Sequence, residues 1–179
     1  MAKIILKKKQ GLTKEADEQG WIPLHHAAHF GNLSIVKLLM QYDKFSAYIG
    51  DKGKRTALHI AARRGSVAIM KEIISCCPDC CEIVDQRGWN VLHFAMESHK
   101  YDAVDYLNQN LWLSNLLNEK DAKGNTPLHR LAASLCEHTS FPDNSRVDKM
   151  AMNMENLTAL DIAKENDDFP ENKVCNVYV

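Results

Sequence analysis

One short phrase occurs five times along the chain, and this repetition constrains the fold more than any other feature. It reads LHHAA from residue 24, LHIAA from 58, LHFAM from 92, LHRLAA from 128 and, in altered form, LDIA from 160. The leucines are 34, 34, 36 and 32 residues apart. A unit of a repeat protein buries its apolar face only against a neighbouring unit. The sequence therefore predicts a stack of similar modules.

Each module begins with the same turn signal, an acidic or amide residue followed three positions later by glycine or asparagine. Such a spacing is typical of a tight turn with a positive φ angle, which Gly and Asn accept at low cost. In the second module, Gly53 stands one residue early after Asp51, so the geometry of that turn stays open. The pairs with the regular spacing are Asp17 and Gly20, Asp85 and Gly88, Asp121 and Gly124, and Asn153 and Asn156.

Two helices are predicted after each turn. Thr56 and Thr126 stand where a helix N-cap is expected, and Pro127 occupies the first helical position, where its missing N–H does no harm. Gly31 and Gly65 are placed to end the first helices. Apolar residues at helical spacing then predict the second helix of three modules. These residues are Ile35, Val36, Leu38 and Leu39; Ile69, Met70, Ile73 and Ile74; and Ala103, Val104, Tyr106 and Leu107.

The turn glycine, the Thr-Pro-Leu-His phrase, the Ala-Ala pair and a period near 33 resemble ankyrin repeats over residues 17–166. This resemblance implies an all-α fold, an ankyrin-repeat solenoid of helix-turn-helix repeats joined by β-hairpin-like turns. Longer phrases such as DEQGWIPLHHAAHFG and ENLTALDIAKEND are similar to the plant ankyrin-transmembrane family of the accelerated-cell-death type, which carries a PGG domain. That similarity implies the cytosolic ankyrin region of a defence or cell-death signalling protein.

We expect a single ankyrin-repeat domain over residues 1–179, belonging to a longer protein or a shortened gene product. Pro142 interrupts the fourth repeat, so its second helix is expected to be missing or no longer than a turn. The expected parts are the outer helix of a truncated preceding repeat (1–16), three repeats (17–50, 51–84 and 85–120), an irregular repeat with a long loop (121–152), and a partial terminal repeat with a tail (153–179).

Charge and composition exclude several classes of function. The chain has 22 Lys and Arg against 23 Asp and Glu, so its net field gives nucleic acid little attraction. No stretch approaches the roughly 18 apolar residues of a membrane span. The six cysteines follow no secretory leader, which favours a reducing compartment. We therefore predict a cytoplasmic location, at the cytosolic face of the plasma membrane if a full-length relative carries C-terminal spans.

The histidines recur with the repeats and resemble a metal-binding pattern at first. Zinc needs three or four converging ligands, whereas histidines of successive repeats lie about 10 Å apart, the packing distance of helices. The ankyrin resemblance implies instead a structural ladder, in which His25, His59, His93 and His129 bond the turn threonine and the backbone of the adjacent unit. Ile22 and Asn90 replace that threonine, so weaker first and third rungs are expected. No metal and no cofactor is predicted.

The cysteine cluster Cys76–Cys81 reads CCPDCC and offers two overlapping Cys spacings. A zinc site would need a second pair, and only the isolated Cys136 and Cys175 remain. An incidental, reduced cluster is favoured, with a metal- or redox-responsive module as the alternative function. The lysines at 7–9 suit the end of a helix better than a nuclear signal.

Catalysis has little support in the sequence. Cys136 and His138 are two residues apart on an expected helix and point to different sides, so they form no nucleophile–base pair. Phosphate-binding glycine loops, Gly-x-Ser-x-Gly elbows and HExxH pairs are absent. We therefore predict that the chain is not an enzyme.

The ankyrin resemblance implies that partner contacts come from the turn tips and the first helices. Trp21, Arg55, Trp89 and Asn125 occupy one equivalent column there, and tryptophans beside basic groups are typical of binding hot spots. The alternative is that each tryptophan folds back over its own turn and the arginines are merely solvated. The candidate partner-binding residues are Trp21, His29, Phe30, Lys52, Arg55, Arg63, Arg64, Arg87, Trp89 and Asn125.

The predicted function is therefore a non-catalytic protein-protein interaction scaffold. Its expected partner is an acidic or amphipathic protein segment, with the arginines pairing carboxylates and Trp21, Phe30 and Trp89 supplying apolar anchors. A membrane-signalling role is the second hypothesis, and metal or redox sensing the third. Binding of nucleic acid by stacked aromatics and arginines is the weakest alternative.

Overall fold

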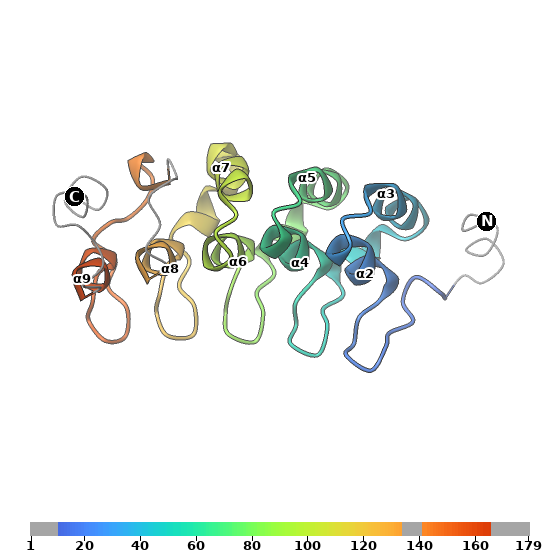
Figure 1. The fold of residues 1–179 in the computed structure, drawn as a ribbon, viewed down its shortest axis with the longest axis horizontal. Helices are drawn as coiled ribbons and strands as arrows, with labels where there is room; N and C mark the ends of the chain where they lie inside the picture. The colour runs from blue at the N-terminus through green and yellow to red at the C-terminus, as the bar shows by residue number, and fades with distance from the viewer. Residues whose placement is uncertain (1–10, 134–140, 166–179) are drawn as a thin grey trace. The chain divides into compact units, whose positions relative to one another are not determined.

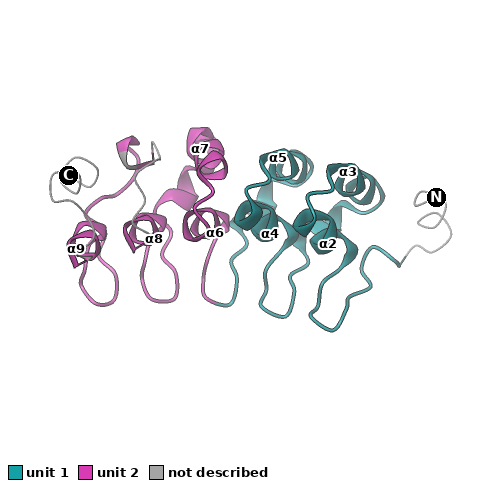
Figure 2. Ribbon diagram, viewed as in Figure 1, with its two compact units in different colours: residues 1–86 teal, residues 87–179 magenta. Residues whose placement is uncertain are grey.

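The computed structural model describes residues 11–133 and 141–165, and within these ranges the chain is all-α. Its elements there are α-helices and short 3-10 helices, without a β-strand, which confirms the predicted fold class. The chain divides into two compact units, residues 1–86 and 87–179 (Figure 2).

Unit 1 contains two helical hairpins in two layers. In Figure 1, the first helices α2 and α4 lie side by side, and the second helices α3 and α5 form the other layer. A 3-10 helix follows each second helix and leads to the next turn. The elements are α2 (Pro23–His29), α3 (Leu33–Tyr42), η1 (Lys44–Tyr48), α4 (Ala57–Arg64), α5 (Val67–Cys76) and η2 (Pro78–Glu82).

Unit 2 starts with a similar hairpin and then becomes irregular. Helix α8 packs against both α6 and α9, so three first helices form one layer (Figure 1). In the described part of the fourth repeat, η4 with three residues is the helical element that follows α8. The elements are α6 (Val91–Glu97), α7 (Tyr101–Gln109), η3 (Leu111–Leu117), α8 (Pro127–Ala133), η4 (Phe141–Asp143) and α9 (Ala159–Glu165).

The core consists of the apolar faces of the first helices, which carry the phrase, and of the second helices. Four of the five leucines of the phrase are buried, Leu24, Leu58, Leu92 and Leu128, and Leu160 is half-buried. Helices of seven to ten residues are too short to be stable alone in water, so packing against neighbours is what holds them in shape. The repeat is therefore a unit of packing as well as of sequence.

The turns keep their register through all the repeats, including the second. Gly20, Gly88, Gly124 and Asn156 adopt φ angles of 82°, 75°, 78° and 59°. In the second repeat, Lys54 takes the equivalent position with a φ of 61°. The early glycine, Gly53, has no positive φ, so the open question about this turn is answered by a lysine in the left-handed region.

Some of the expected parts lie outside the described residues. Most of the predicted truncated helix (1–16) falls in residues 1–10, and the described remainder forms a turn closed by the Lys14 amide donating to the Gly11 carbonyl. The cysteine and histidine at 136 and 138, and the tail after residue 165, are also outside the described ranges.

Candidate partner-binding surfaces

The tips of four turns are held by a carboxylate or amide, of Asp17, Asp51, Asp121 or Asn153, that accepts two backbone N–H groups. Asp51 Oδ1 accepts the amides of Gly53 and Arg55 at 2.8 and 2.9 Å, and Asp121 Oδ1 does the same for Lys123 and Asn125. Such Asx turns fix the direction of the residues that follow. The side chains at the tips are therefore presented on a rigid support.

Neighbouring tips within a unit are also tied to each other by backbone hydrogen bonds. The Lys52 amide donates to the Gln19 carbonyl in unit 1, and the Ala122 amide donates to the Arg87 carbonyl in unit 2. A further bond links the Met154 amide to Lys123. Equivalent tip residues consequently lie side by side within each unit.

The four histidines of the phrase lie at the starts of the first helices and are buried. His25 Nε2 donates to the Arg55 carbonyl at 2.9 Å, and His129 Nε2 donates to the Leu157 carbonyl at 3.1 Å. Burial lowers the pKa of both rings, although these backbone bonds oppose the shift. The lowered pKa favours the neutral imidazole, whose Nδ1 can accept the backbone amide of Ile22 or Thr126.

The other ring nitrogen of these histidines faces the helix start. Thr56 and Thr126 each place a backbone amide and a hydroxyl within 3.1 Å of Nδ1 of His59 and His129. In the third repeat, Asn90 takes the place of threonine and caps the helix by accepting the amides of Leu92 and His93. A weaker third rung was predicted because threonine is absent at position 90, and that prediction did not consider that asparagine also bonds the helix start.

Among the residues that the structure describes, there is no group of three His, Cys, Asp or Glu side chains placed to hold an ion.

Trp21 is half-buried against histidines of its own repeat. Its ring centroid lies 5.1 Å from that of His26 and 5.2 Å from that of His29. The indole Nε1 donates to Asp51 Oδ2 at 3.2 Å, across to the next turn. One face of Trp21 is thus committed to the fold, and only part of it remains for a partner.

Trp89 is buried, with 4% of its surface exposed, so the prediction that it is an exposed anchor is wrong. The guanidinium of Arg87 lies 3.5 Å from its ring centroid, and that of Arg130 lies 4.5 Å away. The indole Nε1 donates to Asp121 Oδ2 at 3.0 Å. Two cation-π contacts and a hydrogen bond therefore hold Trp89 inside unit 2.

The predicted basic residues of unit 1 fall into two groups. Arg55 is engaged, because its Nη2 and Nε lie 2.7 and 2.8 Å from Asp51 Oδ2. Lys52, Arg63 and Arg64 are exposed. Near its first helices, unit 1 therefore has fewer basic side chains without an ion pair than the sequence suggested.

The remaining candidate partner-binding residues also differ in their exposure and in the contacts that they already make. Phe30, at the end of α2, is 77% exposed, with His29 packed against its ring at 5.1 Å. Arg87 is exposed but stacks on Trp89, and Asn125 accepts a hydrogen bond from Asn153 at 3.0 Å. Phe30 is thus the apolar candidate that is open to a partner.

Three cysteines of the cluster Cys76–Cys81 are buried, and Cys76 alone is exposed. Burial raises the pKa of the Cys77 thiol, and a hydrogen bond with Cys81, with burial, raises that of Cys80. A reactive thiol needs a lowered pKa. Cys77 and Cys80 therefore lack the lowered pKa of a reactive thiol, and the 3-10 helix η2 carries the buried Cys80 and Cys81.

Several exposed apolar side chains were not anticipated from the sequence. They stand on 3-10 helices and loops, where helical periodicity gives no signal. The most exposed are Phe45, Leu111, Trp112, Met150 and Met154.

The described helices are short, the longest having ten residues. None of them combines the length and the apolar character needed to cross a membrane.

Comparison with known proteins identifies the repeats. A family model described as ankyrin repeats, in three copies, matches residues 1–80 and 43–115. Delta-latroinsectotoxin-Lt1a of Latrodectus tredecimguttatus is 31% identical over 71 residues, which are 40% of this chain and 6% of the toxin. Alpha-latrotoxin-Lh1a of Latrodectus hasselti is 29% identical over 101 residues, 56% of this chain and 8% of the toxin. The chain thus matches less than a tenth of the length of these relatives.

Proposed function

Because the chain belongs to the ankyrin-repeat family, we propose that it is a non-catalytic scaffold that binds an acidic segment of a partner protein through unit 1. The observation that carries this proposal is a pair of exposed arginines beside an exposed phenylalanine on the first helices. Arg63 and Arg64 have no ion pair among the described residues, and Phe30 is open to solvent. A large exposed aromatic next to unpaired cations is typical of an interaction surface.

Equivalence within the repeat supports treating these side chains as one surface. Phe30 and Arg64 are 34 residues apart and occupy equivalent positions at the ends of α2 and α4. These helices pack against each other, and packed helices have axes about 8 to 10 Å apart. A single peptide segment can therefore contact both side chains at once.

The chemistry of the surface points to carboxylates. Arginine forms paired hydrogen bonds with carboxylates, and Lys52 adds a third positive charge on the neighbouring turn. An apolar residue of the same segment would cover Phe30. The expected ligand is therefore a segment with two or more acidic residues beside an apolar one.

A selection from a random peptide library, with the full chain as bait, tests this proposal. The enriched peptides should combine Asp or Glu with an apolar residue. Removing both arginines, Arg63→Ala with Arg64→Ala, should weaken their binding at least tenfold, about 1.4 kcal/mol, without moving the unfolding temperature. Enrichment without acidic residues would contradict the proposal.

The matched control removes two positive charges from the second helices of the same unit. Lys37→Ala with Lys71→Ala changes α3 and α5 by the same net charge. These variants should bind the enriched peptides as well as the original chain does. Equal weakening in both pairs would mean that net charge alone attracts the peptides.

A narrower proposal concerns where the scaffold acts. The phrases similar to plant ankyrin-transmembrane proteins would make it part of a defence or cell-death regulator in the cytoplasm, at the plasma membrane. Only those phrases support it, and the relatives reported above are spider proteins. A full transcript that encodes apolar spans downstream, together with membrane localisation of its product in plant cells, would support it. A transcript without such spans would count against it.

A further inference from the structure

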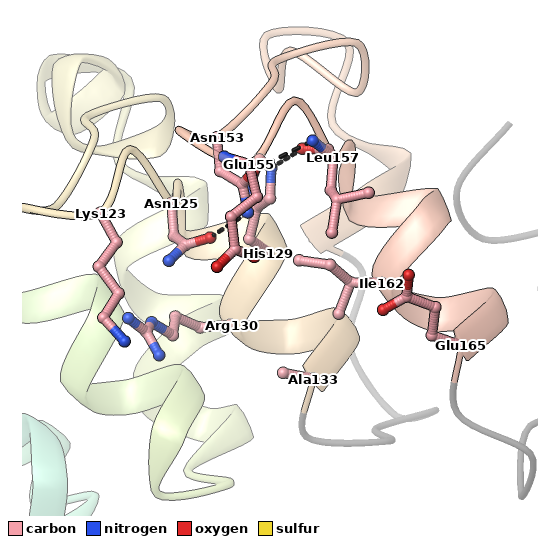
Figure 3. A pocket seen from close by; sticks show the side chains of 10 residues that line it. All are labelled: Lys123, Asn125, His129, Arg130, Ala133, Asn153, Glu155, Leu157, Ile162 and Glu165. Carbon is pink, nitrogen blue, oxygen red and sulfur yellow. Dashed lines mark hydrogen bonds between the residues drawn. The ribbon is translucent and has the colours of Figure 1, made fainter.

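The described part of unit 2 contains a cavity of about 260 Å³ between its last two repeats (Figure 3). Its walls come from two successive turns and from the helices α8 and α9. This volume is below the roughly 300 to 1,000 Å³ of sites for drug-sized ligands. The cavity therefore suits one or two side chains of a peptide and not a large cofactor.

One end of the cavity is positively charged. Lys123 stands on the first of the two turns, is exposed, and has no ion pair among the described residues. Arg130 extends from α8 toward the same end (Figure 3). A ligand that carries a carboxylate would find the exposed ammonium of Lys123 here, beside an arginine that is also paired with Asp121.

Arg130 is held in place by the fold and still has hydrogen-bonding capacity. Its Nη2 donates to Asp121, and its guanidinium lies 4.5 Å from the ring centroid of Trp89. Its Nε is buried and has no hydrogen-bond partner among the residues that the structure describes. A buried donor without an acceptor is unfavourable, so a ligand acceptor that reached this nitrogen would be favoured.

The other end of the cavity is negatively charged. Glu165 ends α9, and Figure 3 shows its carboxylate on the side of Ile162 away from Lys123 and Arg130. Glu155, on the second turn, adds another carboxylate to the lining, and Figure 3 shows it on the side of Ile162 that faces Asn125, so Glu165 alone makes this end negative. Both glutamates are exposed and have no ion pair in the part of the chain that the structure describes.

Apolar side chains separate the charged ends. Leu157 and Ile162 are half-buried, and Ala133 is the exposed end of α8. They offer contact to a small or medium apolar side chain. A purely acidic ligand would face the two glutamates, and a purely basic one would face the lysine and the arginine. A ligand with both charges avoids both repulsions.

We propose that this cavity binds a bipolar peptide motif of a partner protein, in which an apolar residue lies between an acidic and a basic residue. The acidic side chain pairs with Lys123 and Arg130, the apolar one contacts Leu157 and Ile162, and the basic one pairs with Glu165. This proposal rests on the scaffold function, but it uses residues of unit 2 that the surface of unit 1 does not share.

The test is a titration of the full chain, labelled with ¹⁵N, by three synthetic peptides of equal length. One carries Asp-Leu-Lys between Gly-Ser flanks, one carries Asp-Leu-Asp, and one carries Lys-Leu-Lys. The bipolar peptide should bind at least tenfold more tightly than either other peptide. The shifted amide signals should cluster at residues 123–130 and 153–165. Equal affinities, or shifts elsewhere, would overturn the proposal.

Two single charge reversals test the polarity of the cavity. Lys123→Glu should change the preference to Lys-Leu-Lys, and Glu165→Lys should change it to Asp-Leu-Asp. A gain of binding for a new peptide cannot result from unfolding, so these variants remain informative even if their stability changes. An unchanged preference in either variant would overturn the assignment of its residue.

Two further comparisons separate the possible failures. Arg63→Ala with Arg64→Ala should leave binding of the bipolar peptide intact, so its loss in that variant would overturn the independence of this cavity. A fourth peptide has the sequence of residues 166–179, the segment that follows Glu165 in the chain. This segment contains acidic, apolar and basic residues. Displacement of the bipolar peptide by this fourth peptide would assign the cavity to the chain's own C-terminal segment.

Discussion

Trp21 in unit 1 and Trp89 in unit 2 occupy the same position of the repeat, yet their surroundings differ. Each donates its indole N–H to the aspartate of the following turn, Asp51 or Asp121. Trp21 is otherwise covered by histidines of its own repeat and stays half-buried. Trp89 is enclosed between two arginine side chains and is almost fully buried.

The difference originates at two other positions of the repeat. Two residues before the tryptophan, unit 1 has Gln19 where unit 2 has Arg87. Two residues after the leucine of the following phrase, unit 1 has Ile60 where unit 2 has Arg130. The role of a repeat position therefore depends on what its neighbours in two repeats supply. A column of equivalent residues does not share one function.

The largest expected effect is that of removing the enclosed indole. Trp89→Ala should lower the free energy of unfolding by about 3 to 5 kcal/mol, because a buried aromatic and its contacts are lost. Trp21→Ala should have roughly half that effect, since half-burial removes less apolar area from water. Urea unfolding followed by circular dichroism measures both. Equal losses would show that the arginine stacking does not distinguish the two sites.

The turn after Trp89 offers the next largest effect. Gly124→Ala should destabilise by about 2 to 3 kcal/mol, because φ is 78° and a Cβ atom would come within 2.9 Å of the Met154 amide nitrogen. Gly53→Ala is the matched control in unit 1, since this glycine has no positive φ. Thermal unfolding of the two variants compares them. A large loss in the control would contradict this explanation.

Removing the negative charge of either turn aspartate should have the next largest effect on the free energy of unfolding. Asp121→Asn should lower the free energy of unfolding by about 2 kcal/mol, because Arg130 and Trp89 lose a charged acceptor. Asp51→Asn should have a smaller effect, because its partner Arg55 is more exposed than Arg130. Urea unfolding at pH 7 measures both variants, and equal effects would contradict the comparison.

The same aspartates predict an acid-dependent loss of stability. Burial alone would raise the pKa of Asp121, but hydrogen bonds from Arg130 and from two turn amides outweigh it and keep the pKa below its usual value. The pKa of Asp51 is lowered in the same way by Arg55. Their contribution is present above about pH 4, the unfolded pKa, and is lost as pH falls through the lowered folded values.

Unfolding temperatures measured between pH 6 and pH 3 check this dependence. The original chain should lose stability toward pH 3, and Asp121→Asn should show a shallower decline, because this residue no longer titrates. An identical decline in both proteins would exclude Asp121 as a source of the pH dependence.

The smallest expected effect is a gain. Lys54 has a φ of 61°, which is unfavourable for a side chain, whereas glycine accepts it freely. Lys54→Gly should stabilise by about 0.5 kcal/mol, the strain relieved minus the added chain entropy of glycine. Lys52→Gly is the control and should destabilise, since Lys52 has no positive φ. Urea midpoints resolve the two, and a loss in both would contradict the assignment of strain.

The regular spacing of the phrase predicted the helices and the turn register well. These features are local: an asparagine caps a helix, a threonine bonds the histidine three residues later, and an aspartate bonds its own turn. The burial of the cysteines was harder to predict. The 3-10 helix η2, which carries the buried Cys80 and Cys81, has no apolar periodicity that the sequence would reveal. The positive φ of Lys54 could not be predicted either, because lysine is an unusual residue at a left-handed turn position.

By itself, the sequence determined that this protein folds as stacked helical repeats, because the signals that build each repeat act over a few residues and recur along the chain. Only the tertiary structure decided which equivalent side chains remain available to a partner. Burial of Trp89 depends on Arg130, 41 positions later, and the polarity of the cavity in unit 2 depends on side chains from two repeats. Such contacts form when folding brings distant residues together, and no spacing within one repeat encodes them.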